Sequence, residues 1–347
     1  MDQVLRVLVV DDSAYVRKAI KQMLSRSPFL EVVGIARDGQ EALELVEQLR
    51  PDVVTCDLIM PVMDGVSFVR EQMSRRPLPI VVVSIANEGS EMALAALDLG
   101  AVDFAQKPTA LATEKIYEVS DELIEKVKAA AGVPMARLQA VLEREPPRVA
   151  ALRPKQASLI DIIVLGISTG GPQALKHLIP QLPADFPVPI VIVMHMPVGY
   201  TEMYAQKLNE ISELKVSEAH EGDLIKPGSV LLAPAGRHLT MHRQASDEVV
   251  IHLSARPFDA PHRPSVDVMF QSAAEVYGNR TMGVVMTGMG ADGKQGAAWI
   301  KSQGGMIFTE AEQSCVVYGM PGSVVEAGLS DKSIPLEQMA QSILEVV

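Results

Sequence analysis

Residues 52–65 read DVVTCDLIMPVMDG, and this stretch decides the fold that we expect for the N-terminal part of the chain. Its first half is an apolar run of the kind that forms a buried strand, and this run ends in the carboxylate of Asp57. Its second half is a loop that Pro61 stiffens and that Asp64 and Gly65 turn. Because residues that follow parallel strands lie along one edge of the sheet, we expect Asp57 to be exposed at that edge.

The sequence around this stretch alternates short apolar runs with helical periodicity over the first 125 residues. Strands are expected at residues 4–10, 31–36, 52–57, 80–85 and 102–105. Helices are expected after Ser13, which is a good N-cap, and near 42–49, 65–75, 89–99 and 116–127. Five strand–helix units of this length predict a flavodoxin-like, doubly wound parallel sheet.

A second alternation begins at residue 160 and predicts another doubly wound, mostly parallel α/β domain. Its expected strands are 160–166, 188–195, 281–287 and 306–309, with shorter, partly antiparallel strands within 216–253. Its expected helices lie near 172–179, 200–209, 265–276, 294–302, 319–326 and 335–346. The region between the two alternations is rich in Pro, Ala and Arg and reads as a linker with one short helix near 135–144. The predicted domains are therefore 1–125 and 158–347, joined by a linker at 126–157.

Composition limits the function classes. The net charge is −12, and the two predicted domains are acidic, whereas residues 126–157 carry 7 Lys/Arg and 2 Asp/Glu. Nucleic-acid binding needs a basic face, so we expect none. The apolar runs are of strand length, so we expect no membrane insertion, and the N-terminus has no signal-peptide pattern, which predicts a cytoplasmic protein. Two cysteines argue against a disulfide scaffold or a cysteine-based zinc site.

Polar residues at the ends of four predicted strands indicate a first site. Asp11 and Asp12 follow the first strand, Asp57 ends the third, Ser84 ends the fourth and Lys107 follows the fifth, just before Pro108. Three carboxylates at one sheet edge repel one another unless a cation joins them, and an all-oxygen set suits Mg²⁺. Lys107 and Ser84 could then contact a phosphoryl group on Asp57.

These residues resemble the receiver domain of two-component response regulators, over about the first 125 residues. The resemblance rests on VDDS at 10–13, the run from Asp57 to Gly65, SIA at 84–86 and the segment from Gly100 to Pro108. It implies that Asp57 is phosphorylated by a histidine kinase and that Asp11, Asp12 and Asp57 hold Mg²⁺. It also implies that Ser84 and Phe104 are the switch residues and that Lys107 contacts the phosphate.

A second site is indicated by GISTG at 166–170, which matches the G-x-S-x-G pattern between a strand and a helix. Ser168 is a candidate nucleophile there, but glycine-rich turns after strands also bind phosphates. The segment is not G-x-G-x-x-G and lacks the acidic residue that a dinucleotide site needs.

A serine nucleophile needs a base and an orienting carboxylate. His195 ends a strand next to the one that leads to Ser168, and Asp292 follows strand 281–287 on the same edge, with Asp267 as the alternative carboxylate. We expect His177 to lie on a helix surface and His252 to be structural. His238 and His242 have zinc-pair spacing but lack the Glu of H-E-x-x-H.

The second half resembles the chemotaxis protein-glutamate methylesterases over residues 158–347, so that the whole chain matches their receiver–linker–esterase pattern. The motifs that carry the resemblance are GISTGGP at 166–172, MHMP at 194–197, AP at 233–234, RPSVD at 263–267 and TGMGADG at 287–293. It implies hydrolysis of glutamate γ-methyl esters and deamidation of specific glutamines on chemoreceptors by a Ser168–His195–Asp292 triad that needs no cofactor. The candidates on the oxyanion side are Thr169, Gly170 and Met289.

Three rival functions stay open from the sequence: a non-catalytic, partner-binding output domain, a dinucleotide-dependent oxidoreductase, and an esterase that acts on another methylated protein.

Overall fold

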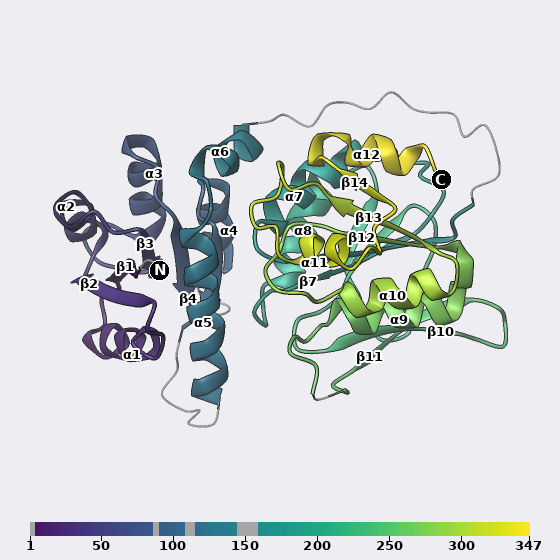
Figure 1. Ribbon diagram of the computed structural model, residues 1–347, viewed down its shortest axis with the longest axis horizontal. Helices are drawn as coiled ribbons and strands as arrows, with labels where there is room; N and C mark the ends of the chain where they lie inside the picture. Colours follow the sequence, from purple (N-terminus) through teal and green to yellow (C-terminus); the bar gives the residue numbers. More distant parts are fainter. Residues whose placement is uncertain (1–3, 86–89, 108–114, 144–158, 258) are drawn as a thin grey trace. The chain divides into compact units, whose positions relative to one another are not determined.

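A five-stranded parallel sheet of order β2-β1-β3-β4-β5 forms the centre of the first of two units, Met1–Leu142 (Figure 1). Its strands are β1 (Leu5–Val10), β2 (Leu30–Ala36), β3 (Val53–Cys56), β4 (Ile80–Ser84) and β5 (Asp103–Gln106). The helices are α1 (Ala14–Leu24), α2 (Gly39–Leu49), α3 (Gly65–Arg75), α4 (Ser90–Asp98), α5 (Lys115–Ala131) and α6 (Met135–Glu143). The expected doubly wound fold is confirmed.

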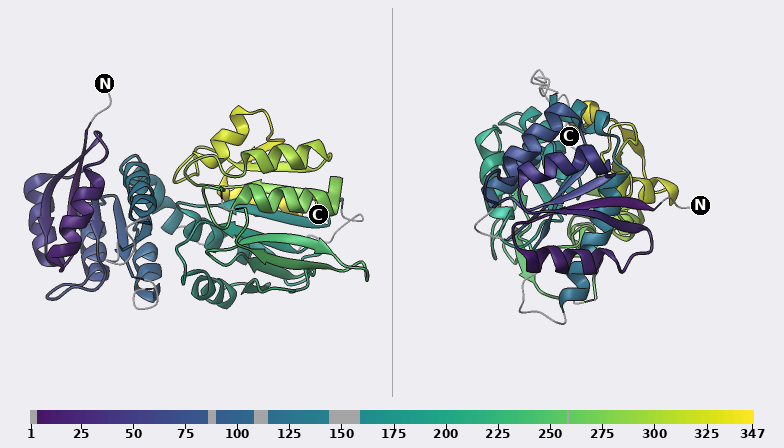
Figure 2. Two further views of the ribbon diagram at one scale, coloured as in Figure 1. Left: turned by 90° about the horizontal axis from the view of Figure 1, so that it is seen from below. Right: turned by 90° about the vertical axis from the view of Figure 1, so that its left-hand side faces the viewer.

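The helices of this unit cover both faces of the sheet, because α1 packs against α5, and α3 against both α2 and α4 (Figure 2). Local sequence signals set where these helices begin. The Ser13 hydroxyl accepts a hydrogen bond from the Val16 amide (3.5 Å), as expected of an N-cap. Asp64 caps α3 through the Ser67 amide (2.7 Å), so the turn predicted at Asp64 and Gly65 also starts a helix.

The second unit, Glu143–Val347, is built on a seven-stranded sheet of order β14-β13-β12-β6-β7-β9-β8 in which every pairing is parallel. The strands of this sheet are β6 (Ile162–Ile167), β7 (Ile190–Met194), β8 (Lys215–Glu218), β9 (Ser229–Leu232), β12 (Thr281–Val285), β13 (Met306–Glu310) and β14 (Lys332–Ile334). Its helices are α7 (Gly171–Leu178), α8 (Thr201–Glu210), α9 (Val266–Tyr277), α10 (Lys294–Ser302), α11 (Met320–Glu326) and α12 (Leu336–Leu344).

Helices flank this sheet as well: α9 packs against α10 and β6, whereas α7 packs against α8 and α12 (Figure 2). The expected antiparallel content is a hairpin of β10 (His238–Arg243) and β11 (Val249–Ser254), and β10 packs against α9 (Figure 1). A buried apolar core joins the two layers, with Val164, Val193, Phe270 and Ile300 all fully buried.

Three features differ from the expectations or lie beyond them. Strand β14 was not predicted, because its sequence, Lys-Ser-Ile, has no apolar run. His177, expected on the surface of a helix, is buried. Helix α5 continues past residue 125 to Ala131, and the division into 1–125, 126–157 and 158–347 stays a prediction.

The structure is a computed structural model that describes residues 4–85, 90–107, 115–143, 159–257 and 259–347, so that Ala86, Pro108 and residues 144–157 of the predicted linker lie outside it. Among the described helices, none combines the length and the apolar character that a membrane crossing requires.

Candidate functional site

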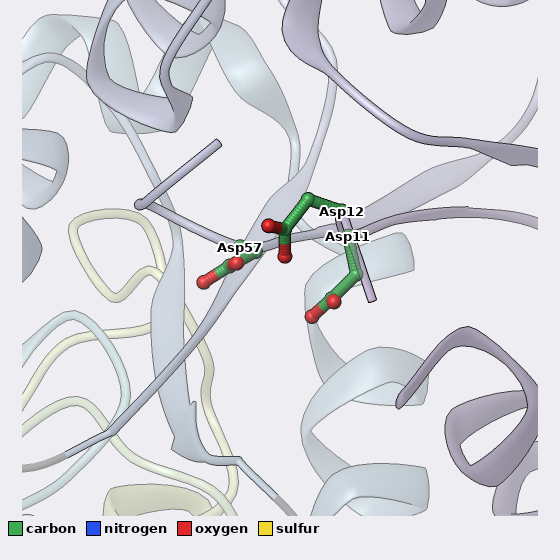
Figure 3. Close-up of side chains that lie close together, drawn as sticks. All are labelled: Asp11, Asp12 and Asp57. Atoms are coloured by element: carbon green, nitrogen blue, oxygen red, sulfur yellow. The ribbon is translucent and has the colours of Figure 1, made fainter. Parts of the chain in front are cut away.

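Three carboxylates lie at the switch point of the first sheet, where the strand order reverses between β1 and β3. Asp11 and Asp12 directly follow β1, and Asp57 directly follows β3 (Figure 3). One oxygen from each carboxylate lies within 4.8 Å of the others, and the three residues form a group that could hold a metal ion. Ligand sites of open α/β sheets form at this place, and the three carboxylates lie close together as expected.

Lys107 reaches this cluster from the end of β5. Its Nζ lies 2.7 Å from Asp57 Oδ2 and 3.0 Å from Asp11 Oδ2. Burial opposes the charged form, but the hydrogen bonds to Asp57 and Asp11 raise the pKa of Lys107 overall. Burial raises the pKa of the Asp11 carboxyl, against the hydrogen bond from Lys107. The ammonium group is therefore a fixed positive charge beside two buried carboxylates.

Asp57 is buried, with 3% of its surface exposed, so the expectation that it is exposed was wrong. Lys107 covers one side of it, and the loop from Leu58 to Gly65 folds back tightly over the strand end. The Gly65 amide donates to the Leu58 carbonyl (2.9 Å), and a Cβ at Gly65 would lie 2.1 Å from the Asp57 carbonyl oxygen. Only the absence of a side chain at Gly65 allows this close approach.

The two predicted switch residues, Ser84 and Phe104, are also buried. Among the described residues, their side chains form no hydrogen bond with the three carboxylates of the cluster. The Ser84 hydroxyl donates to the Ile85 carbonyl (3.4 Å). The Phe104 ring lies 5.6 Å from the Nζ of Lys126, which also donates to the Phe104 carbonyl (2.6 Å).

The second candidate site lies at the switch point of the second sheet, where the strand order reverses between β6 and β12. Ile167 pairs with Met194, so Ser168 and His195 are the next residues on two adjacent parallel strands. The His195 amide donates to the Ile167 carbonyl (3.2 Å), which holds the two strand ends together. Half-buried Ser168 enters a turn at Gly170, whose φ of 79° favours glycine, and α7 begins at the next residue.

Room for Ser168 is provided by the neighbouring strand end. A Cβ at Gly288 would lie 2.8 Å from the Ser168 Cβ and 2.4 Å from the Met320 sulfur, so only glycine fits at this position. The Ser168 amide donates to the Thr287 carbonyl (3.0 Å). The loop after β12 therefore fixes the position of the candidate nucleophile.

His195 is paired with the carboxylate that the sequence indicated first. The distance between His195 Nε2 and Asp292 Oδ2 is 2.8 Å, and both side chains are almost completely buried. Because a carboxylate accepts here, Nε2 is the ring nitrogen that donates to Asp292. Nδ1 is buried and has no hydrogen-bond partner within the described residues. Nδ1 is therefore the ring nitrogen left open to another partner, although it makes no direct hydrogen bond to the Ser168 hydroxyl.

Asp292 is held in place by the N-terminus of α9. It accepts hydrogen bonds from the Ser265 hydroxyl (2.9 Å) and from the amides of Val266 (2.8 Å) and Asp267 (2.9 Å). Burial alone would raise the pKa of the Asp292 carboxyl, but the hydrogen bonds with His195 and these amides hold that pKa well below its usual range. Asp292 is thus a preorganised anion facing the imidazole.

Asp267, the alternative carboxylate, makes no hydrogen bond with His195. Its Oδ1 instead accepts from the amides of Gly293 (2.9 Å) and Gly296 (2.7 Å), at the start of α10. Asp292 therefore caps the start of α9, the helix that contains Asp267, and Asp267 caps the start of α10, the helix that follows Asp292. Burial raises the pKa of Asp267 to about 6, against these amide hydrogen bonds, and the nearby Asp292 charge adds to the rise.

The candidates on the oxyanion side surround the Ser168 turn. Gly170 and Met289 have amide groups that donate to no acceptor in the described part of the chain. The Ser168 and Gly171 amides are engaged, by the carbonyls of Thr287 (3.0 Å) and Ser168 (2.7 Å). Thr169 is buried, and its carbonyl accepts from the Thr287 hydroxyl (2.9 Å).

Sequence reasoning missed three residues of this site. His262 stacks on His195, with ring centroids 4.1 Å apart and planes 21° apart. Ser265 caps α9 through the Val268 amide and also binds Asp292, and its signal was a serine just before a helix. Glu310 is a fully buried carboxylate behind Thr287, and only its place at a strand end pointed to it.

Of the other histidines, His238 borders the site. It is buried on β10, where Nε2 donates to the Pro257 carbonyl (3.0 Å) and Nδ1 accepts from the Ser265 amide (3.2 Å), and burial lowers its pKa. His242 is exposed on the same strand, and among the described residues only the three aspartates at the first site form a group suited to a metal. His252 is exposed and pairs with Glu221 (2.8 Å).

Comparison with known families gives two matches. The family described as CheB methylesterase matches residues 163–343, which contain Ser168, His195 and Asp292. The family described as response regulator receiver domain matches residues 7–118, which contain Asp11, Asp12, Asp57 and Lys107.

Individual relatives agree with both matches. A Myxococcus xanthus protein named protein-glutamate methylesterase/protein-glutamine glutaminase 5 is 50% identical over 337 residues, covering 96% of each chain. A Halalkalibacterium halodurans protein named protein-glutamate methylesterase/protein-glutamine glutaminase is 44% identical over 348 residues, covering 99% of each. The crystal structure of the Thermotoga maritima CheB methylesterase catalytic domain is 42% identical, with a TM-score of 0.53, and covers 54% of this chain and 99% of that one.

Proposed function

The chain belongs to the CheB methylesterase family and carries a response regulator receiver domain, and from this premise we propose that it is a phosphorylation-activated serine hydrolase of chemotaxis. Its substrates are the glutamate γ-methyl esters of chemoreceptor cytoplasmic domains, and it also deamidates specific receptor glutamines to glutamate. The observation that carries the proposal is the His195–Asp292 pair at the strand end next to Ser168.

In the proposed mechanism, the Ser168 hydroxyl attacks the ester carbonyl while His195 Nδ1 takes its proton. Asp292 keeps the Nε2–H tautomer and stabilises the imidazolium that forms. The imidazolium then protonates the leaving methoxide, which departs as methanol, and a glutamyl ester of Ser168 remains. Water attacks this ester with His195 again as the base, which restores Ser168 and leaves a glutamate carboxylate on the receptor. With a glutamine substrate, the first leaving group is ammonia.

The negative charge that develops on the carbonyl oxygen needs donors. We assign the amides of Gly170 and Met289 as these donors, because neither amide has another acceptor in the described residues. Thr169 lies on the same turn and is the third candidate. One such donor contributes roughly 3 kcal/mol to transition-state stabilisation.

For the receiver domain, we propose that a chemotaxis histidine kinase supplies a phosphoryl group to Asp57. The three clustered carboxylates fit a hard, oxygen-preferring cation, so Asp11, Asp12 and Asp57 would hold Mg²⁺. The ion would neutralise charge on the carboxylates and on the phosphoryl oxygens. Lys107 then offers a fixed positive charge to the phosphoryl group. Ser84 and Phe104 transmit the conformational change that follows phosphorylation. A cytoplasmic location follows from the proposed partners.

The test uses membranes that carry methylated chemoreceptors and measures methanol release by the full chain with a small-molecule phosphodonor. Ser168→Ala should abolish the release, and Ser212→Ala, which alters a serine outside the site, should not. Equal release by the Ser168→Ala variant and by wild type would exclude Ser168 as the nucleophile.

A further inference from the structure

Glu310 is a carboxyl group that the proposed mechanism does not use, and it is fully buried at the end of β13. Its Oε2 accepts a hydrogen bond from the Thr287 amide (2.9 Å), and its Oε1 lies 3.0 Å from the Ser314 hydroxyl. Among the described residues, no Lys, Arg or His side chain forms an ion pair with it. Burying a carboxyl without a counter-charge costs free energy, and this one is connected to the Ser168 turn through Thr287, which points to a role at that turn.

Thr287 links Glu310 directly to the turn that carries the nucleophile. The Thr287 carbonyl accepts from the Ser168 amide (3.0 Å). The Thr287 hydroxyl donates to the Thr169 carbonyl (2.9 Å) and accepts from the Val317 amide (3.0 Å). The amide, the carbonyl and the hydroxyl of Thr287 are thus all engaged, and Glu310 holds the amide. A shift of Thr287 would therefore move both Ser168 and Thr169.

Ser314 allows the Glu310 carboxyl to be satisfied in its neutral form as well. The Ser314 hydroxyl oxygen accepts from the Leu336 amide (3.0 Å), and its proton can go to Glu310 Oε1 or to the Ala311 carbonyl (3.2 Å). When Glu310 is protonated, its O–H donates to the Ser314 oxygen, and Ser314 donates to Ala311. Burial raises the pKa of Glu310 to about 7, so this neutral form is well populated near neutral pH.

We propose that Glu310 is a positioning residue for the Ser168 nucleophile. Its carboxyl group fixes the Thr287 amide, and Thr287 in turn fixes the backbone of Ser168 and Thr169 in the position that nucleophilic attack requires. The inference rests on the proposed serine hydrolase function, but the local order that it predicts does not depend on any substrate. A side chain that holds a single amide through its oxygen can be replaced by glutamine, which keeps that acceptor and can donate to Ser314.

The experiment compares Glu310→Gln, Glu310→Ala and Ser314→Ala in the full chain. Ser314→Ala is the matched control, because it disturbs the same buried pocket without removing the acceptor of the Thr287 amide. Two quantities are measured: kcat and KM for methanol release from methylated receptor membranes, and amide hydrogen exchange of a peptide spanning Ser168. Fluorescence of Trp299, the only tryptophan, verifies that the second unit is folded.

We expect Glu310→Ala to lower kcat at least tenfold with KM within about threefold of wild type, and to speed exchange at the Ser168 turn by a similar factor. Glu310→Gln should restore both values to within about threefold, and Ser314→Ala should leave both within that range. Wild-type rates in a folded Glu310→Ala variant, or equal losses in Glu310→Ala and Ser314→Ala, would overturn the proposal. Absence of methanol release from wild type would count against the proposed function instead, and hydrogen exchange would still decide the role of Glu310.

Discussion

The burial of Glu310 predicts a specific dependence of stability on pH. In the unfolded chain the carboxyl has a pKa near its ordinary value of 4.5, whereas burial raises the pKa to about 7 in the fold. A folded-state pKa that is raised means that stability is greatest below 4.5 and is lost as the pH rises toward 7. At about 1.4 kcal/mol per pKa unit, the loss is about 3 kcal/mol in total, and about 2.5 kcal/mol of it falls between pH 5 and pH 8.5.

The assay is urea unfolding of wild type and Glu310→Gln, followed by Trp299 fluorescence at pH 5 and at pH 8.5. Trp299 is the only tryptophan and lies on α10, so its signal reports on the second unit. The difference between the free energies of unfolding of the two proteins cancels the contributions of other titratable groups. These groups include Cys315 and Glu337, which face Glu310. We expect the variant to gain about 2.5 kcal/mol over wild type between the two pH values.

A matched control is Glu326→Gln, which removes an exposed carboxylate from α11 of the same unit. A stability difference between wild type and Glu310→Gln that stays constant within about 0.5 kcal/mol across this range would refute the reasoning. It would mean that Glu310 is as well solvated in the fold as in the unfolded chain.

Three further predictions concern the two sites. Asp292→Asn should lower kcat by about 10⁴-fold, because an amide N–H facing His195 moves the imidazole proton to Nδ1; methanol release within tenfold of wild type would contradict this role. Asp267→Asn keeps an oxygen for the amides at the start of α10 and should retain activity within about threefold. Asp267→Ala loses a helix cap of about 1 kcal/mol and loosens Asp292, so it should lower kcat roughly tenfold. Equal rates for the two variants would exclude a positioning role for Asp267. Asp57→Asn should keep the basal rate and lose stimulation by a phosphodonor, and stimulation that persists would exclude Asp57 as the acceptor.

The sequence predicted the fold of both units because their strands are continuous apolar runs separated by capped helices. Residues at the ends of parallel strands were predicted correctly as neighbours, and both sites lie where the strand order reverses. The resemblance to receiver domains and chemotaxis methylesterases is confirmed by the family matches. Strand β14 was missed because three residues with one apolar side chain carry no periodic signal.

Burial and hydrogen bonding at the sites were harder to predict, since they depend on packing that no local pattern records. Asp57 is covered by Lys107, which lies 50 residues away in sequence. His195 and Asp292 are separated by 97 residues, and only the sheet order shows that they meet. Asp267, the alternative carboxylate, makes no hydrogen bond with His195, and its role as a cap of α10 depends on how closely α9 and α10 pack. Glu310 lies in no recognisable sequence motif, because its proposed positioning role depends on a hydrogen bond from the backbone amide of Thr287.

The most direct test of the central claim is methanol release from methylated receptor membranes, measured for wild type and Ser168→Ala with and without a phosphodonor and Mg²⁺. We predict release that the phosphodonor stimulates in wild type and that is absent from Ser168→Ala in both conditions. No release from wild type in either condition would contradict the claim that this chain is a receptor methylesterase.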